Sequence, residues 1–297
     1  MHAPTSGDLF PGVDLGSSER RAPGGLPVHQ LLQPRWASTA PILVGTSGYS
    51  FADWVGPFYP HGFTARDMLS FYSHQFPVVE VNCTYYRIPS PRGFHQMARC
   101  TPPGFRFMVK LNQVMTHQQR LPSEVLASFR AILEPLLAAG KLAGLLAQFP
   151  WSFKRNRWNQ RFLEALRRSL PEAPLFVEFR HASWVVPATW QLLGDLGLGY
   201  TVVDEPDLPG LVPPVVKLTT PLGYLRLHGR NAAHWWGHSG PERYNYLYSR
   251  PELSDWLPQL REMAERAEKV YVFFNNCHAG QAAQNAQLMQ ELLAREI

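Results

Sequence analysis

The chain has 297 residues, of which 45% are hydrophobic and 12% aromatic, which excludes a disordered chain and suffices for a large buried core. Its formal net charge of +5 favours anionic partners, but the dense basic runs of a nucleic-acid-binding tail are absent. Three widely spaced cysteines form no disulfide framework and no Cys-x-x-Cys metal motif. No apolar run reaches the ~18 residues of a membrane helix, and the amino terminus lacks a signal-peptide layout. We therefore expect a cytoplasmic protein with no membrane partner.

Residues 1–40 differ in composition from the rest of the chain. They are rich in proline, glycine and serine and show no sustained hydrophobic period. This composition predicts a flexible extension that docks at most locally, through Trp36. The folded domain is expected over residues 41–297.

From residue 41 onward, short apolar runs alternate with amphipathic stretches. Strands are predicted at 42–46, 78–82, 105–110, 142–149, 174–180, 199–204, 223–228 and 270–275. Helices are predicted near 64–75, 91–99, 122–139, 157–170, 187–196, 252–268 and 280–296. In number and size these elements match a single-domain α/β fold, the (β/α)8 barrel of TIM type. A doubly wound open sheet is the alternative, because strand number alone does not prove closure.

Polar residues occupy alternate positions near the ends of the predicted strands. In 224–228, for example, Leu225 and Leu227 alternate with Arg226 and His228. Side chains of a barrel strand face the helices and the interior in turn, so the apolar set faces the helices. By this rule, the side chains expected to point inward are Glu80, Asn82, Lys110, Gln148, Glu178, Arg180, Asp204, Arg226 and His228, together with either Asn275 or Asn276. Since all strands of a parallel barrel end on one face, these side chains are expected to surround one pocket.

Further candidates follow the same strand ends. His181 comes directly after Arg180, and Gly229 allows a turn that brings Arg230 to the same mouth. Aromatic residues in the connecting loops are candidates for stacking on a sugar or a base. The principal ones are Tyr49, Trp54, Tyr86 and Trp184, with Tyr85, Trp235, Trp236, Tyr244 and Tyr246 as further members.

Nine motifs recur in an order typical of a known family. They are GTSGYS (45–50), W-x-G-x-FYP (54–60), VEVNCTYYRIP (79–89), F-x-F-x-VK (105–110) with TH (116–117), QFP (148–150), VEFRHASW (177–184), RLHGR (226–230), YNYLYS (244–249) and VFFNN (272–276). Over residues 42 to 296 the chain resembles the YecE-like family, also called domain of unknown function 72. The resemblance implies a TIM-type barrel and no assigned reaction. Tyr49 departs from the family pattern, in which a tryptophan is frequent.

Three functions remain open. The first is a hydrolase acting on a phosphorylated sugar, nucleotide or nucleic-acid end. It is suggested because cations outnumber carboxylates in the predicted pocket and because arginine binds phosphate or carboxylate well. Its catalytic set is Glu80, Glu178, Asp204 and His228, with His228 as acid and base. The same four side chains could hold a divalent ion, although their spacing gives no specific metal signal.

The second function is a glycosidase with Glu80 and Glu178 as paired carboxylates and the aromatic residues as sugar subsites. The third is a non-catalytic module that binds a phosphorylated ligand or single-stranded nucleic acid. The expected partner is an anionic small molecule or a nucleic-acid fragment, and no protein partner is indicated.

Overall fold

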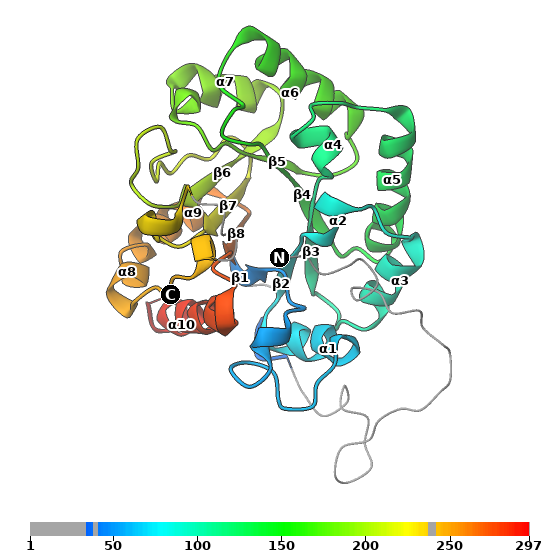
Figure 1. Cartoon of the computed structure of the whole chain (residues 1–297), viewed down its shortest axis with the longest axis vertical. Helices are drawn as coiled ribbons and strands as arrows, with labels where there is room; N and C mark the ends of the chain where they lie inside the picture. Colours follow the sequence, from blue (N-terminus) through cyan, green and yellow to red (C-terminus); the bar gives the residue numbers. More distant parts are fainter. Residues whose placement is uncertain (1–33, 38–40, 237–241, 297) are drawn as a thin grey trace.

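The computed structural model describes residues 34–37, 41–236 and 242–296, and there it confirms the single-domain closed barrel (Figure 1). Parallel strands pair in chain order, and the last pairs with the first to close the ring. The strands are β1 (Ile42–Ser47), β2 (Val78–Val81), β3 (Arg106–Lys110), β4 (Leu142–Gln148), β5 (Leu175–Glu178), β6 (Leu198–Asp204), β7 (Leu222–Leu227) and β8 (Lys269–Phe274). The open-sheet alternative is excluded.

Helices surround the strands on the outside of the ring (Figure 1). They are α1 (Ala65–Gln75), α2 (Cys83–Tyr86), α3 (Pro91–Arg99), α4 (Gln113–Thr116), α5 (Ser123–Ala138), α6 (Arg157–Ser169), α7 (Pro187–Asp195), α8 (Arg250–Ser254), α9 (Leu257–Arg266) and α10 (Gln281–Glu296). Within the described ranges, no helix is long and apolar enough to cross a membrane.

The helix prediction was wrong in two respects. The helix expected over 252–268 is divided into α8 and α9, because α9 begins anew with Pro258 in its first turn, where its missing N–H costs no hydrogen bond. The short helices α2 and α4 were not predicted, since four residues are too few to show a helical period.

Two apolar layers lie on opposite sides of the strands. The larger layer packs between strands and helices, and a smaller one fills the interior of the barrel. The interior layer consists of Leu43, Val78, Met108, Ala143, Leu146, Phe176, Tyr224, Tyr271 and Phe273. Because these residues lie below the carboxyl ends of the strands, the inward positions at those ends remain for polar side chains.

The predicted extension over 1–40 lies mostly outside the described residues. Within the described part, the Trp36 indole donates a hydrogen bond to the Ser73 carbonyl at 2.9 Å. Its ring packs on Phe105, with centroids 6.4 Å apart. Trp36 therefore docks against the domain, as expected.

Gly45 allows a close backbone approach between β1 and β2. A Cβ at this position would lie 2.0 Å from the Val78 carbonyl oxygen. We expect Gly45→Ala to lower the free energy of unfolding by about 1–3 kcal/mol, measured by urea denaturation, because the strands must separate. The control is Gly194→Ala in α7, whose nearest atom would be 3.9 Å away. Equal stabilities of the two variants would contradict the close approach.

Candidate functional site

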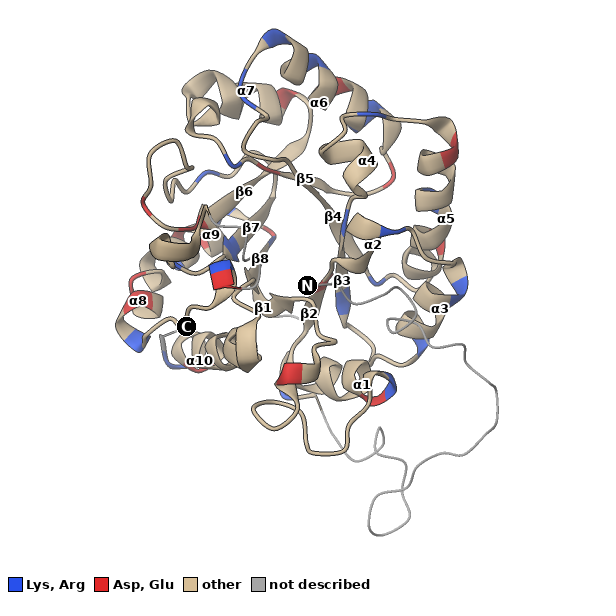
Figure 2. Ribbon diagram, in the orientation of Figure 1, with Lys and Arg blue, Asp and Glu red and all other residues tan. Residues whose placement is uncertain are grey.

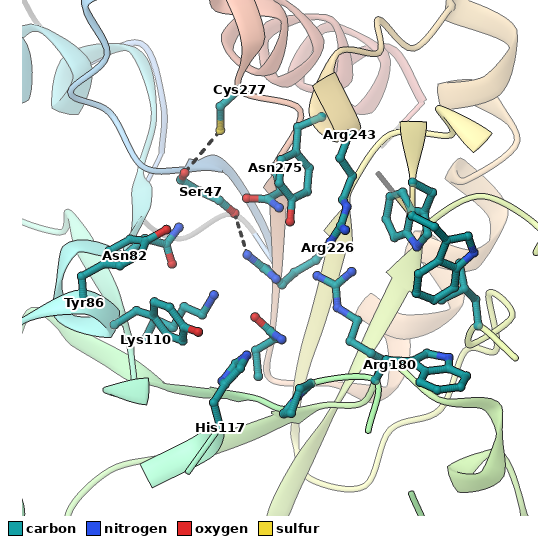
Figure 3. A pocket seen from close by; sticks show the side chains of 18 of the residues that line it. Ser47, Asn82, Tyr86, Lys110, His117, Arg180, Arg226, Arg243, Asn275 and Cys277 are labelled. Carbon is teal, nitrogen blue, oxygen red and sulfur yellow. Dashed lines mark hydrogen bonds between the residues drawn. The ribbon is translucent and has the colours of Figure 1, made fainter. Parts of the chain in front are cut away.

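A cavity of about 600 Å³ opens at the carboxyl ends of the strands (Figure 3). Most of the polar residues predicted to point inward do line it, as do aromatic residues from the connecting loops. The polar lining consists of Ser47, Asn82, Lys110, His117, Gln148, Arg180, Arg226, Arg243 and Asn275. The cavity is therefore the pocket that the strand alternation predicts.

Arg226 lies at the floor of the cavity between two buried carboxylates. Its Nη2 is 2.7 Å from Glu80 Oε1, and its Nη1 is 2.6 Å from Glu178 Oε2. The Tyr224 hydroxyl donates to the other Glu80 oxygen at 2.5 Å. Burial opposes ionisation of Glu178, but Arg180 and Arg226 outweigh it and hold the pKa of this carboxyl well below its usual range. Glu178 is thus ionised, and neither carboxylate lines the cavity.

Arg180 connects this group to a third carboxylate that the sequence analysis missed. Its Nε is 2.5 Å from Glu178 Oε1, and its Nη1 is 3.0 Å from Glu205 Oε2. The other Glu205 oxygen accepts the Val212 amide at 3.2 Å. Burial raises the pKa of Glu205 to about 7 against the opposing effect of Arg180. At neutral pH Glu205 therefore offsets only part of the cationic charge.

His228 is sealed beneath the cavity rather than exposed to it. Its Nδ1 lies 3.0 Å from the Asn275 amide nitrogen, which donates, so the proton of the neutral ring is on Nε2. That Nε2 faces Glu178 Oε1 at 3.3 Å. Burial and then Arg180 lower the pKa of His228 to about 3, which keeps the ring neutral. His228 is therefore fully buried beside Glu178 and lies outside the cavity lining, where no ligand of the cavity reaches it.

Two cations of the lining have no carboxylate partner among the described residues. Lys110 Nζ lies 4.8 Å from the centre of the Tyr85 ring, and Arg243 lies over Trp235 at 5.3 Å. The Arg243 Nε is buried, and no group in the described part of the chain forms a hydrogen bond with it. Burial and then Arg226 lower the pKa of Lys110 to about 8. Arg243 was not predicted, because it lies in a loop where no strand alternation indicates its direction.

The expectation that Asp204 faces the interior is wrong. Asp204 pairs in register with Leu227, which packs on the helix side, so Asp204 shares that side. There it accepts two hydrogen bonds from Arg230, at 2.9 and 2.6 Å, and others from Tyr248 and Trp256. The error arose because Val202 and Val203 are both apolar, so the alternation along β6 did not show which residues face the helices and which face the barrel interior. Arg230, bound to Asp204, does not line the cavity either.

Several predicted aromatic contacts are core residues. Trp54 and Trp184 are fully buried, and their indoles donate to the Cys277 and Phe153 carbonyls at 2.7 and 2.6 Å. Tyr49 packs against the core and does not line the cavity. The aromatic residues that do line it are Phe51, Tyr85, Tyr86, Trp151, Trp235, Trp236 and Tyr244. Tyr86, 72% exposed, and Trp236, 55% exposed, are open to a ligand.

The remaining candidates are divided between the cavity and its surroundings. Asn275 lines the cavity, whereas Asn276 donates to the Tyr246 carbonyl and to Asn285, both at 2.8 Å. The alternation could not distinguish these neighbours. His181 accepts the Ser183 amide at 3.0 Å and begins a helical turn outside the cavity lining.

The four proposed metal ligands do not converge. Glu80 and Glu178 are bound by arginines, His228 is enclosed beneath them, and Asp204 lies on the opposite side of its strand. In the described parts of the chain, no three His, Cys, Asp or Glu side chains are arranged to hold a metal ion. These residues thus offer no ready cation site.

Fold and site together define an α/β barrel with a cationic pocket at the carboxyl ends of its strands. The family model described as "protein of unknown function DUF72" matches residues 43–297, so the chain belongs to the DUF72 family. It is 34% identical over 269 residues to the UPF0759 protein YunF of Bacillus subtilis (strain 168), covering 85% of this chain and 94% of that protein.

Solved structures of the family have the same fold. A DUF72 protein from Thermotoga maritima MSB8 is 44% identical and superposes with a TM-score of 0.80, covering 86% of this chain and 100% of that one. A second, from Enterococcus faecalis V583, is 29% identical with a TM-score of 0.77, covering 85% of this chain and 95% of that one. The family resemblance read from the motifs is confirmed.

Removal of the Arg226 guanidinium tests the buried ion group. We expect Arg226→Met to lower the free energy of unfolding by about 3–5 kcal/mol, because it leaves buried carboxylate charge without its partner. The triple variant Glu80→Gln, Glu178→Gln, Arg226→Met should recover part of the loss in the same urea titration. As a control, Arg130→Met removes an ion pair whose partners are 44% and 33% exposed, and should cost less than about 1 kcal/mol. Similar losses for Arg226→Met and Arg130→Met would refute the network's role.

Proposed function

We propose that this chain is a hydrolase-type enzyme that binds an anionic, phosphorylated substrate at the mouth of the barrel. The observation that carries the proposal is the group of four cations, Lys110, Arg180, Arg226 and Arg243, among the described residues lining one cavity. On the outer helices, residues of both charge signs are scattered (Figure 2). Guanidinium groups suit the paired oxygens of phosphate.

The size and rim of the cavity favour a sugar phosphate, a nucleotide or the end of a nucleic acid. About 600 Å³ lies within the range of sites for small organic ligands. Trp151 and Trp236 meet edge to face at the rim with centroids 5.8 Å apart, and Tyr86 is exposed beside the same cavity. A sugar or base can stack on such rings while the cations bind its phosphate.

The side chain best placed to move a proton is His117 rather than His228. His117 lines the cavity, and its Nδ1 is 3.1 Å from the Thr116 hydroxyl, which leaves Nε2 for a ligand or water. Burial and then Lys110 lower the pKa of His117 to about 4, so the ring is a neutral base at neutral pH. We assign it the activation of water, while Glu80 and Glu178 hold the arginines.

The same geometry disfavours the glycosidase alternative. Glu80 and Glu178 are fully buried against one guanidinium, and neither lines the cavity. Paired glycosidase carboxylates must reach the two sides of a sugar. The non-catalytic binding module remains as the competing outcome of the experiments below.

Arg243 tests the anion site. We expect Arg243→Gln to weaken binding of adenosine monophosphate and inorganic phosphate about tenfold in isothermal titration calorimetry, because a charge-assisted hydrogen bond is lost. Binding should also weaken with added salt. The control is Arg168→Gln, an exposed position at the end of α6, which should bind like the unaltered chain. Unchanged affinity of Arg243→Gln, or no binding at all by the unaltered chain, contradicts the proposal.

His117 tests catalysis separately from binding. We expect His117→Gln to hydrolyse p-nitrophenyl phosphate or its diester at least about 10²-fold more slowly, with phosphate affinity preserved. Because the base form exists above a pKa of about 4, activity should be lost only as the pH falls through that value. A chain that binds phosphate but turns over neither ester is a binding module. Activity unaffected in His117→Gln would remove this residue from the mechanism.

A further inference from the structure

We propose that Lys110 is also a nucleophile, which forms an imine with a carbonyl group on the bound anion. The substrate class is then a phosphorylated aldehyde or ketone, such as a sugar phosphate in its open-chain form. The inference rests on the proposed anion site and adds a covalent reaction that hydrolysis does not require. It is carried by the surroundings of Lys110 in the cavity (Figure 3).

The amino group of Lys110 is not committed to the protein. It lines the cavity from the end of β3, and among the described residues it lies over the face of the Tyr85 ring at 4.8 Å. Lys141 is the opposite case, since its Nζ donates to the Ala98 carbonyl at 2.8 Å and to both Thr101 oxygens at 2.7 and 2.9 Å. A lysine that serves the fold is bound in the manner of Lys141. Lys110 leaves its nitrogen available to a ligand.

Burial and neighbouring charges keep part of this amine neutral near physiological pH. Burial is the main cause and Arg226 the next, and together they lower the pKa of Lys110 from 10.5 to about 8. Only the neutral amine can attack a carbonyl carbon. The arginines that bind the phosphate therefore also favour the reactive form of the lysine beside it.

An unpaired acceptor lines the same cavity. The Oδ1 of Asn82 is buried and has no hydrogen-bond partner among the described residues. Arg226, Lys110 and Asn82 point toward one cavity in Figure 3. A hydroxyl formed at the substrate carbon would give Asn82 the donor it lacks.

The reaction balances without any further reagent. The Nζ lone pair forms a bond to the carbonyl carbon as the C=O π bond breaks, and the proton that leaves nitrogen passes to oxygen. The carbinolamine then loses its hydroxyl and the remaining N–H proton as water, which leaves the C=N bond. Addition of water reverses both steps and restores the lysine.

The test uses pyridoxal 5′-phosphate, which carries both an aldehyde and a phosphate. The full-length chain is incubated with this probe, reduced with borohydride and digested, and the labelled lysine is identified by mass spectrometry. We expect rapid labelling of Lys110 that inorganic phosphate suppresses at least tenfold, and far slower labelling by pyridoxal, which lacks the phosphate. The labelling rate should rise as the pH rises through about 8, because the neutral amine becomes the major form above its pKa.

Matched variants separate this inference from the proposed function. Lys110→Arg keeps the charge but cannot form an imine, so it should bind phosphate and lose the label. Lys217→Arg, at an exposed position, should be labelled at Lys110 like the unaltered chain. Labelling of Lys154 or Lys217 as fast as Lys110, or an absent label in a chain that binds phosphate, overturns the imine and leaves the anion site standing. Failure to bind phosphate refutes the proposed function as well.

Discussion

The position of the Arg226 guanidinium between two buried carboxylates is the constraint on which the mouth of the barrel depends. Arg226 belongs to β7, Glu80 to β2 and Glu178 to β5, and none of these strands is adjacent to another in the ring. The ion pairs therefore cross the interior just above the apolar layer that fills the lower barrel. Apolar side chains could fill the barrel interior at this height without lowering the free energy of unfolding, because burial of charged groups is itself unfavourable. We interpret the charged group as a means of holding polar side chains in place rather than as a source of stability.

The charge available to a ligand follows from this arrangement. Glu80 and Glu178 are bound by arginines, and neither side chain lines the cavity. Glu205, the third carboxylate, is close to half protonated at neutral pH because burial raises its pKa to about 7. Lys110 and Arg243 then contribute positive charge that no described carboxylate neutralises. A pocket built in this way suits the anion that we propose, and burial, followed by the charge of Arg226, lowers the pKa of its own lysine.

The sequence was most informative where backbone geometry dictates side-chain direction. Alternation along well-defined strands placed Glu80, Glu178 and Arg226 in the interior correctly, and the family motifs agreed with the closed barrel. It failed for Asp204, where two consecutive valines hide the alternation. Loops carry no such period, so Trp54 and Trp184 were assigned to the rim although both are buried, and Arg243 was missed. The strand part of the site is thus encoded locally, whereas the loop part depends on tertiary packing.

The engagement of each side chain within the protein also determines which residues can react with a ligand. A side chain whose polar atoms are all engaged within the protein can orient its neighbours, but it cannot exchange a proton or a bond with a ligand. The fully buried His228 is likewise out of reach of a ligand, because Asn275 donates to its Nδ1 and its Nε2 faces Glu178 outside the cavity lining. Lys110 and His117 differ, because each lines the cavity with a nitrogen that no described side chain occupies. The buried ion pairs are therefore the framework of the site, and the reactivity that we propose is assigned to Lys110 and His117, which line the cavity.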